Sequence, residues 1–445
     1  MSTPTSVAFE TLGCKLNQYE TDAIATELRE RGFSVVDGTH GADAYVINSC
    51  TVTNKADRKS RNTLNRAVRS AGTDGVVVLT GCFVDSHKED LVDSAATYVV
   101  DNTHKNTIPQ VLEAHFRGEV VDPNDLDPNV FGFAAPQRIF HTRTNLKIQD
   151  GCDNFCTFCI IPFVRGRARS RPPQEVVDEA RQAIANGARE LVLTGVNMSR
   201  YTAAGTDFVD LVRALLALEG DFRLRISSLE PDQLDERFSE LFQHPKMCPH
   251  LHLCLQSGSD RILLAMRRMY TIGQYLDVVD QLRAIDPDFT ITTDVIVGFP
   301  GEGETEFAES LAVVDRAQVA HVHMFPYSLR SGTRAERMPL HVSPEEKRAR
   351  GQRLQDAAVI RKQQIRRRFV GRTQRVLVEQ VHTSPEGPVA TGLSEYYHPV
   401  RIVFGDGSPQ GRSDEVLPTA NTFYDVQITA VGDGDDPPLI ARPLS

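Results

Sequence analysis

The sequence lacks an apolar run long enough to span a bilayer, and nothing near Met1 resembles a signal peptide. We therefore expect no membrane contact and a cytoplasmic location. Thiols stay reduced in that compartment, so the eight cysteines indicate metal binding or catalysis rather than disulfides. A length of 445 residues predicts two or three domains.

The sequence also lacks an excess of basic over acidic residues. Its formal net charge is −10, which argues mildly against a nucleic-acid partner, although binding depends on where the basic residues gather. They gather in the run Arg165–Arg171 and in a predicted long helix over Glu345–Arg368. A solvated surface is the plain interpretation of either run. Phosphate contact is the functional one, since arginine suits bidentate phosphate recognition.

Three cysteines, Cys152, Cys156 and Cys159, stand at CxxxCxxC spacing in one loop. Clustered thiolates select iron–sulfur clusters, zinc or cuprous copper. A structural zinc site takes four protein ligands, and the loop offers three, so zinc and a disulfide are the weaker alternatives. An iron–sulfur cluster also takes four thiolates, and three would leave one iron open to a substrate or cofactor.

With the aromatic residue Phe158 before the last cysteine, the loop resembles the signature of radical S-adenosylmethionine enzymes. The resemblance implies a [4Fe–4S] cluster on the three cysteines, with its fourth iron chelated by S-adenosylmethionine. Reduction of such a cluster cleaves the sulfonium and yields a 5′-deoxyadenosyl radical. The motif implies this chemistry and leaves the substrate open.

The first third alternates apolar runs with helical patterns, which predicts a parallel sheet with helices on both faces. Strands are expected at Val7–Leu12, Ala44–Asn48, Gly75–Thr80 and Tyr98–Asp101, and helices at Tyr19–Arg31, Asn54–Ala71 and Thr107–Arg117. Cys14, Cys50 and Cys82 each follow one of the first three strands. The carboxyl ends of parallel strands share one edge, so we expect these cysteines to converge. They could be buried small hydrophobes, but the same position in three units favours a second cluster.

A flavodoxin-like domain with three cysteines, ahead of a radical-SAM domain, is similar to the methylthiotransferase family. The run Thr11–Glu20 resembles the opening of its threonylcarbamoyladenosine (MtaB-type) branch. The isopentenyladenosine branch usually has Gln-Met-Asn where this chain has Lys15-Leu16-Asn17. Asn48–Thr53 and Thr80–Cys82 also match. The following Phe83-Val84-Asp85 departs from the family's usual aromatic-Ala-Gln, which concerns local packing and not the ligand.

From Thr144 the chain repeats strand, loop and helix six times, which predicts a partial TIM-type barrel with its site in the loops after the strands. Strands are expected at Thr144–Gln149, Glu190–Leu193, Arg223–Ile226, His250–Leu255, Phe289–Val297 and Val319–Phe325. Helices are expected at Pro172–Gly187, Phe208–Leu218, Gln233–Phe242, Ser259–Met266, Ile272–Ile285 and Glu304–Ala317. The resemblance implies S-adenosylmethionine contacts from Phe158, Gly195, Asn197, Ser227 and Gln256, and we assign no role to Glu302.

Two further cysteines, Cys248 and Cys254, match no family ligand. Cys254 continues the alternation of His250 and His252, so we expect strand packing. A zinc site made from these four residues is the weaker alternative, because neighbouring ligand types prove little without four convergent donors.

After Gly371, short alternating strands at Arg375–Glu379, Val400–Phe404 and Tyr424–Thr429 predict a small β-barrel. By position and size it resembles the TRAM domain, which grips tRNA in this family. Its loops Gly405–Gly407 and Gly432–Asp436 are acidic, so RNA would bind to the opposite face.

The expected fold class is α/β, in three domains. These are a flavodoxin-like domain with an auxiliary cluster over 5–120, a radical-SAM domain over 138–370 and a TRAM-like RNA-binding domain over 371–440, with a linker at Asp122–Phe133.

The resemblance implies methylthiolation of C2 of N6-threonylcarbamoyladenosine at position 37 of tRNA. Sulfur would come from a [4Fe–4S] cluster on Cys14, Cys50 and Cys82, and the methyl group from a second S-adenosylmethionine. A flavodoxin- or ferredoxin-like protein would donate electrons, and tRNA contacts are expected from Arg165, Arg167, Arg169 and Arg171. The alternatives are isopentenyladenosine in tRNA, a ribosomal-protein aspartate, and a non-catalytic iron–sulfur RNA-binding sensor.

Overall fold

The computed structural model describes residues 5–36, 41–137, 140–384, 387–404 and 418–444. The predicted acidic loop Gly405–Gly407 and the predicted domain start at residue 138 lie outside these ranges. The chain divides into two compact units. The first unit comprises Met1–Asn186, Leu193–Asp207 and Ser328–Arg337, and the second comprises Gly187–Val192, Phe208–Tyr327 and Met338–Ser445. Among the described residues, no helix is long and apolar enough to cross a membrane.

The first unit contains a five-stranded sheet in the order β2-β1-β3-β4-β5, in which all neighbouring strands run parallel. The strands are β1 (Ser6–Thr11), β2 (Ser34–Val36), β3 (Ala44–Ser49), β4 (Val76–Gly81) and β5 (Tyr98–Val100). This strand order is the flavodoxin-like one. The predicted N-terminal fold is therefore confirmed, and β2 is a strand that the prediction missed.

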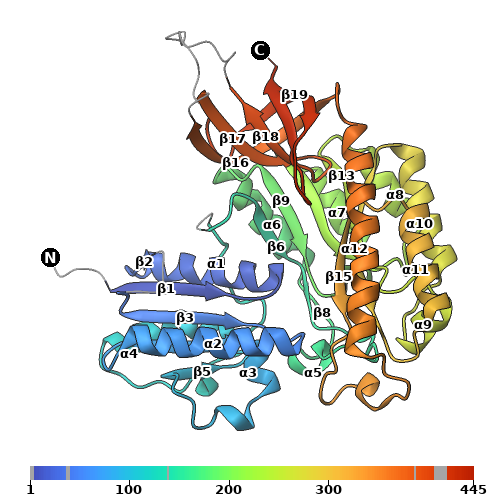
Figure 1. Cartoon of the computed structure of the whole chain (residues 1–445). Helices are drawn as coiled ribbons and strands as arrows, with labels where there is room; N and C mark the ends of the chain where they lie inside the picture. The colour runs from blue at the N-terminus through green and yellow to red at the C-terminus, as the bar shows by residue number, and fades with distance from the viewer. Residues whose placement is uncertain (1–4, 37–40, 138–139, 385–386, 405–417, 445) are drawn as a thin grey trace. The chain divides into compact units, whose positions relative to one another are not determined.

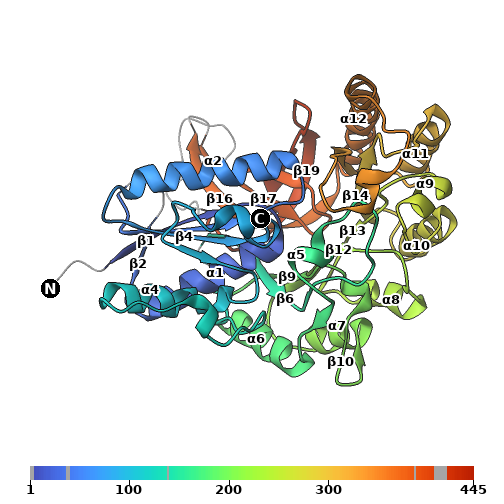
Figure 2. The ribbon, with the colours of Figure 1, turned by 90° about the horizontal axis from the view of Figure 1, so that it is seen from below.

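Helices cover both faces of this sheet (Figures 1 and 2). They are α1 (Lys15–Glu30) and α4 (Ile108–Phe116) on one face, and α2 (Asn54–Ala71) and α3 (Cys82–Ser86) on the other. Helix α2 has the predicted bounds, because the Thr53 side chain caps it by accepting from Ala56 N at 3.1 Å. Helix α1 begins at Lys15 rather than at Tyr19, and Leu16 and Asn17 in its first turn are buried.

A second parallel sheet is open and has the order β15-β14-β13-β12-β9-β6. Its strands are β6 (Thr144–Lys147), β9 (Glu190–Thr194), β12 (Arg223–Leu229), β13 (Met247–Leu253), β14 (Thr290–Val297) and β15 (His321–Pro326). The order in space is the order in the chain, so the predicted partial barrel of six βα units is confirmed. Residues Leu193–Thr194 of β9, together with β6, belong to the first unit, and the rest of the sheet belongs to the second.

The helices that follow these strands lie close to the predicted ranges. They are α6 (Pro173–Ala185), α7 (Phe208–Leu216), α8 (Glu236–Glu240), α9 (Asp260–Ala265), α10 (Ile272–Ile285), α11 (Glu304–Arg316) and α12 (Pro344–Arg367). Helix α8 is shorter than predicted, because the chain tightens into a 3-10 turn at Leu241–Gln243. Short pieces complete the two units: β7 (Gln149–Asp150), α5 (Ile161–Val164), β8 (Arg169–Ser170), β10 (Thr202–Ala203) and β11 (Thr206–Asp207).

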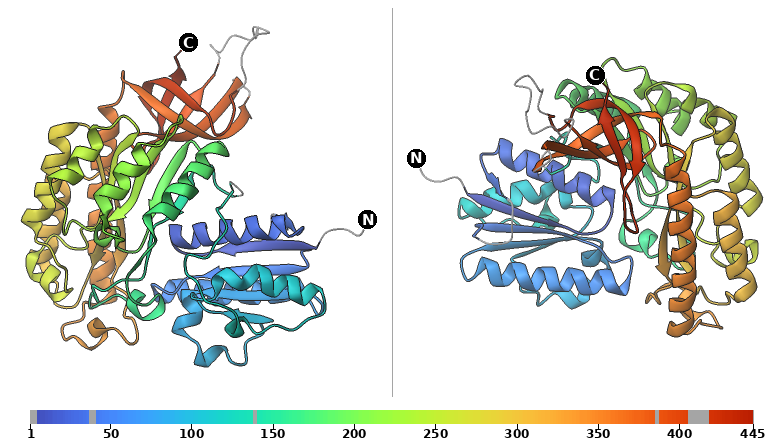
Figure 3. Two further views of the ribbon diagram at one scale, coloured as in Figure 1. Left: turned by 180° about the vertical axis from the view of Figure 1, so that it is seen from behind. Right: turned by 45° about the horizontal axis from the view of Figure 1, so that its top comes forward.

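The C-terminal strands form a closed barrel in the order β16-β17-β18-β20-β19 (Figure 3). They are β16 (Thr373–Ser384), β17 (Gly387–Ser394), β18 (Pro399–Val403), β19 (Phe423–Val431) and β20 (Leu439–Pro443). The barrel was predicted from three of these strands, and β17 and β20 complete it. Its core is apolar and contains Val376, Ile402 and Val426.

Candidate functional site

The structure brings Cys14, Cys50 and Cys82 together at the carboxyl ends of the adjacent strands β1, β3 and β4. Gly13 has a φ of +102°, and a Cβ on it would lie 2.9 Å from the Cβ of Cys50. Only glycine fits so close an approach in this backbone conformation. Phe83 and Val84, where the sequence departs from the family pattern, are buried in the sheet core.

Burial, with a smaller effect of the neighbouring Cys82 and Cys14, raises the pKa of the Cys50 thiol to about 11. Burial also raises the pKa of Cys82, against the opposing charges of Arg165 and Lys105. Thiols in this position become thiolates when a positive group compensates them, and ligation to a metal deprotonates a thiol outright. The donor set therefore fits an iron–sulfur cluster.

The CxxxCxxC loop runs from β7 to α5 and is held from both sides. Cys152 N donates to Gly166 O at 3.1 Å, and Asn154 N donates to the Cys152 sulfur at 3.4 Å. Gly151 has a φ of +71°, and a Cβ there would lie 2.1 Å from Arg167 O. The loop is thus fixed against the chain that returns from it, with Cys152 and Cys156 buried.

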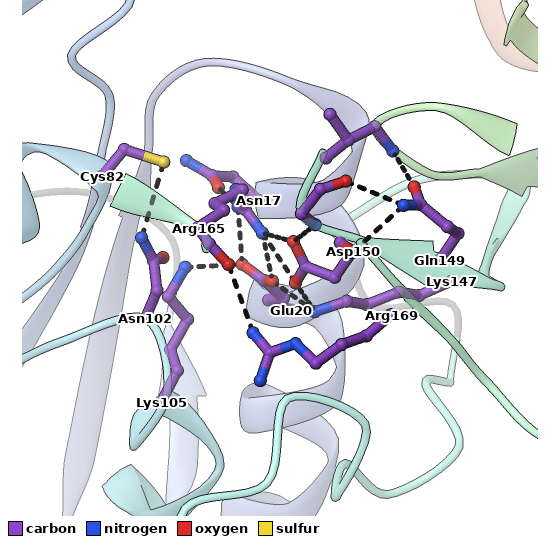
Figure 4. A network of polar contacts seen from close by, with 12 residues as sticks. Asn17, Glu20, Cys82, Asn102, Lys105, Lys147, Gln149, Asp150, Arg165 and Arg169 are labelled. Carbon is purple, nitrogen blue, oxygen red and sulfur yellow. Dashed lines mark hydrogen bonds and ion pairs between the residues drawn. The ribbon is translucent and has the colours of Figure 1, made fainter. Parts of the chain in front are cut away.

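One predicted S-adenosylmethionine contact, Asn197, is buried, and its Nδ2 finds no hydrogen-bond partner among the residues that the structure describes. A buried amide donor without a partner is costly, so a ligand that accepts from it would stabilise this site. Gln149 orients the loop, because its Oε1 accepts from Val196 N and Asn197 N, both at 2.8 Å. Its Nε2 donates to Gly151 O at 2.8 Å (Figure 4). Sequence reasoning gave Gln149 no role beyond ending a strand.

The other predicted cofactor contacts are divided between the units. Gly195 and the half-buried Phe158 belong to the first unit, whereas Ser227 on β12 and Gln256 after β13 belong to the second. Gln256 has a φ of +62° and bonds through its backbone to Asp294 O and Ile296 N, each at 2.8 Å. Glu302, which was given no role, accepts from Gly298 N and from Arg350.

A buried network of charges in the first unit lies near Cys82 (Figure 4) and includes Asp150, two residues before Cys152. Its members are Glu20, Lys105, Lys147, Asp150 and Arg165. Burial disfavours the charged form of Glu20, but Arg165 and the two lysines outweigh it and hold the pKa of Glu20 well below its usual value. All five side chains are joined to one another by ion pairs.

The four arginines of the basic run do not form one surface. Arg165 is buried in this network, and Arg171 is buried against Glu179 and Glu175. Both side chains are buried, so neither is placed to contact a phosphate. Arg167 and Arg169 are exposed. On α12, too, six of the predicted basic side chains pair with acids of their own unit: Arg348, Arg350, Arg353, Arg361, Lys362 and Arg366.

The segment Ser328–Arg337 belongs to the first unit and was missed from the sequence. Arg330 donates to Asp57 and Thr51, just after Cys50, and to Ser86 Oγ at 3.1 Å, just after Cys82. Ala335 N donates to Thr157 O in the CxxxCxxC loop at 2.7 Å. One segment thus contacts the loops of both sets of cysteines.

In the second unit, His252, Cys254 and Asp294 place their ligand atoms within 4.8 Å of one another. Burial opposes the charged form of His252, but hydrogen bonds with Asp294 and Cys254 raise its pKa to about 10. The other two residues of the zinc alternative are not part of this group: the His250 ring stacks on that of Tyr397, with the centroids 4.3 Å apart, and Cys248 interacts with Arg225.

Comparison with known proteins identifies the family. Residues 146–314 match the Radical SAM superfamily, and residues 6–101 match the uncharacterized protein family UPF0004. In fold, the chain resembles the radical S-adenosylmethionine methyltransferase TsrM from Kitasatospora setae, with a TM-score of 0.55 and 16% identity over 72% of this chain and 75% of that one.

Closer relatives are tRNA-modifying enzymes. Threonylcarbamoyladenosine tRNA methylthiotransferase MtaB of Thermotoga maritima is 35% identical over 88% of this chain and 90% of its own. MtaB of Bacillus subtilis is 40% identical, over 78% and 79%. The tRNA-2-methylthio-N(6)-dimethylallyladenosine synthase of Geobacter sulfurreducens is 35% identical, over 84% and 86%. The chain belongs to the radical-SAM methylthiotransferase family and is an enzyme that methylthiolates tRNA.

Proposed function

We propose that the substrate is N6-threonylcarbamoyladenosine at position 37 of tRNA and that the enzyme methylthiolates its C2. The observation that carries the proposal is the presence of two sets of three cysteines in one compact unit, in a chain up to 40% identical to MtaB proteins. Lys15 and Leu16 after Cys14 are the residues that favour this branch over the isopentenyladenosine one.

Each set of cysteines has its own task in the proposal. Cys152, Cys156 and Cys159 hold the cluster that, with S-adenosylmethionine, supplies one-electron cleavage of the sulfonium, while Cys14, Cys50 and Cys82 hold the cluster that supplies sulfur. The amide of Asn197 donates to the bound S-adenosylmethionine, and Gln149 keeps that loop in register with Gly151. Phe158, Gly195, Ser227 and Gln256 complete the set of cofactor contacts, and a flavodoxin- or ferredoxin-like protein delivers the electrons.

In the proposal, the arginines that contact tRNA are those whose side chains are exposed to solvent. Arg167 and Arg169 are the members of the basic run that reach solvent, so they contact the phosphates near the modified base. Arg401 on β18 and Arg442 on β20 are exposed on neighbouring strands of the C-terminal barrel, and that face grips the rest of the tRNA.

The test is mass spectrometry of tRNA nucleosides from cells with the gene, without it, and complemented by a Cys156→Ala copy. The proposal requires 2-methylthio-threonylcarbamoyladenosine to disappear in the last two strains while its unmethylthiolated precursor accumulates. Loss of the isopentenyl counterpart instead would assign the enzyme to the branch of its Geobacter relative. No change in either nucleoside would refute both assignments.

A further inference from the structure

Arg165 is a buried cation that contacts the neighbourhoods of both sets of cysteines. Its side chain is 2% exposed and lies between α1 and the CxxxCxxC loop (Figure 4). One nitrogen, Nη2, donates to Asn17 Oδ1 at 2.6 Å. The other, Nη1, donates to the two oxygens of Asp150 at 3.1 and 3.0 Å. The guanidinium is planar and rigid, so it fixes these two partners relative to each other.

On one side, Asn17 connects two of the auxiliary cysteine loops. Its Nδ2 donates to Leu12 O at 2.7 Å and to Ser49 O at 3.0 Å. These carbonyls lie just before Cys14 and Cys50. Because Nδ2 makes both bonds, Oδ1 is the atom left for Arg165, and the arginine thereby sets the orientation of the amide.

The third auxiliary cysteine is reached through the residue before Arg165. Asn102 Nδ2 donates to Val164 O at 2.9 Å and lies 3.6 Å from the Cys82 sulfur. On the other side, Asp150 Oδ1 accepts from Gly151 N at 2.7 Å, directly before Cys152. A single arginine thus links the entrance of the CxxxCxxC loop with the auxiliary cysteine edge.

The network also places positive charge there. Among the described residues, Arg165, Lys105 and Lys147 form ion pairs with the carboxylates of Glu20 and Asp150. Arg165 interacts electrostatically with both Cys82 and Cys14. Water screens a buried charge little, and a nearby positive charge favours the more negative, reduced state of a cluster.

We propose that Arg165 is a positioning residue that holds the auxiliary cysteine loops and raises the reduction potential of the cluster on Cys14, Cys50 and Cys82. The inference rests on the proposed function only in requiring that second cluster. Removing the charge should lower the potential, because adding an electron then becomes less favourable.

The experiment uses the full chain carrying Cys152→Ala, Cys156→Ala and Cys159→Ala, so that the auxiliary cluster is the one measured. The probe is a dithionite titration followed by electron paramagnetic resonance, with Arg165→Met, Arg165→Lys and, as a matched exposed control, Arg181→Met. Arg165→Met should lower the midpoint potential, whereas Arg165→Lys, which keeps the charge, and Arg181→Met should stay close to the parent. An unchanged potential in Arg165→Met would overturn the proposal.

Folding is monitored by iron content and circular dichroism. Arg165→Met still leaves Lys105 and Lys147 to pair with Glu20 and Asp150, so no buried acid is stranded. If this variant nevertheless loses its iron, Arg165→Gln, which keeps a hydrogen-bond donor and removes the charge, is measured in its place: a lowered potential supports the charge effect, and a potential near that of the parent contradicts it. A parent without any cluster would instead refute the second cluster, and with it the proposed function.

Discussion

Gly151 is a residue at which no side chain can be accommodated. Its φ of +71° is one that residues with a Cβ rarely adopt, and a Cβ would lie 2.1 Å from Arg167 O. Relief would require the return chain to move away, and that chain accepts the hydrogen bond of Cys152 N. The geometry of the CxxxCxxC loop therefore depends on this glycine as much as on its cysteines.

We predict that Gly151→Ala loses the radical cluster and keeps the auxiliary one. The left-handed backbone costs about 1–2 kcal/mol for a residue with a Cβ, and the clash adds to this. Iron per chain should fall to about half, since each cluster holds the same number of irons, and cleavage of S-adenosylmethionine should stop. Gly273→Ala is the control, because the nearest atom to its Cβ would be 3.7 Å away. Full iron content in Gly151→Ala would contradict the prediction.

The two sets of cysteines should also be separable by single substitutions. Cys156→Ala is expected to abolish reductive cleavage of S-adenosylmethionine, whereas Cys50→Ala spares it and stops sulfur insertion. Chromatographic assay of 5′-deoxyadenosine, beside tRNA nucleoside analysis, measures both. If Cys50→Ala also stopped cleavage in a protein with its radical cluster intact, the division of labour between the two clusters would be wrong.

Among the elements, the short segment Ser328–Arg337 bonds to the loops of both sets of cysteines. Arg330, whose side chain is 6% exposed, is paired with Asp57 and also bonds Thr51 and Ser86. Removing one partner of a buried ion pair costs about 3–5 kcal/mol, because the other charge is left without compensation. This segment therefore contributes to the stability of loops that lie far from it in the sequence.

A double-mutant cycle tests this contribution. Arg330→Met should lower the free energy of unfolding by about 3–5 kcal/mol, and Asp57→Asn in the same chain should recover part of the loss, because it removes the stranded charge. Urea denaturation followed by circular dichroism gives the values. Strictly additive losses would show that the two residues do not act as a pair.

The C-terminal barrel contains a titration that should be visible in its stability. His398 is buried, and its ring meets that of Phe369 edge to face, with the ring centroids 4.7 Å apart. Burial, together with Arg366 and Arg225, lowers its pKa to about 3. An unfolded chain takes up this proton near pH 6.5 and the folded chain does not. Stability is therefore full above pH 6.5 and is lost as the pH falls toward 3.

Between pH 7 and pH 5 the loss from His398 is on the order of 2 kcal/mol. His398→Phe, which fills the same space and removes the titration, should reduce the drop in melting temperature over that interval. Part of the drop should remain in this variant, because burial also lowers the pKa of His321, to about 4. Scanning fluorimetry at both pH values measures the difference. Equal drops in the variant and the parent would show that His398 does not titrate on unfolding.

The sequence predicts an element well when residues within or next to that element determine it, and poorly when distant parts of the chain determine it. Helix α2 could be bounded from its own residues, because Thr53 caps its start and Gly72 ends it. Strands β17 and β20 could not, because glycines and prolines weaken their pattern and only barrel closure makes them strands. The six predicted ligand cysteines followed from spacing and strand ends. Gln149, Asn17 and Arg330 did not, since their partners are brought close only by folding.

For the whole molecule, the charge of −10 and the pairing of basic side chains leave few cations for RNA. We predict that Arg167→Ala with Arg169→Ala weakens tRNA binding and lowers the slope of log affinity against log salt by about 1.4–1.8, the value for two phosphates. Filter binding between 50 and 200 mM salt measures it. Arg181→Ala, an exposed arginine paired with Asp178, should leave the slope unchanged. An unaltered slope in the double variant would exclude this run from the interface.

The late position of Arg330 has a consequence for how the protein is made. It lies 244 residues after Ser86 and 279 after Thr51. At about 5–20 residues per second, a ribosome needs roughly 12–50 s to reach it after completing the first sheet. During that interval the nascent chain already displays its three auxiliary thiols without the side chain that will lock their loops. Iron delivered during translation would reach cysteine loops that Arg330 does not yet hold. Iron delivered after release would reach loops that Arg330 already holds in place.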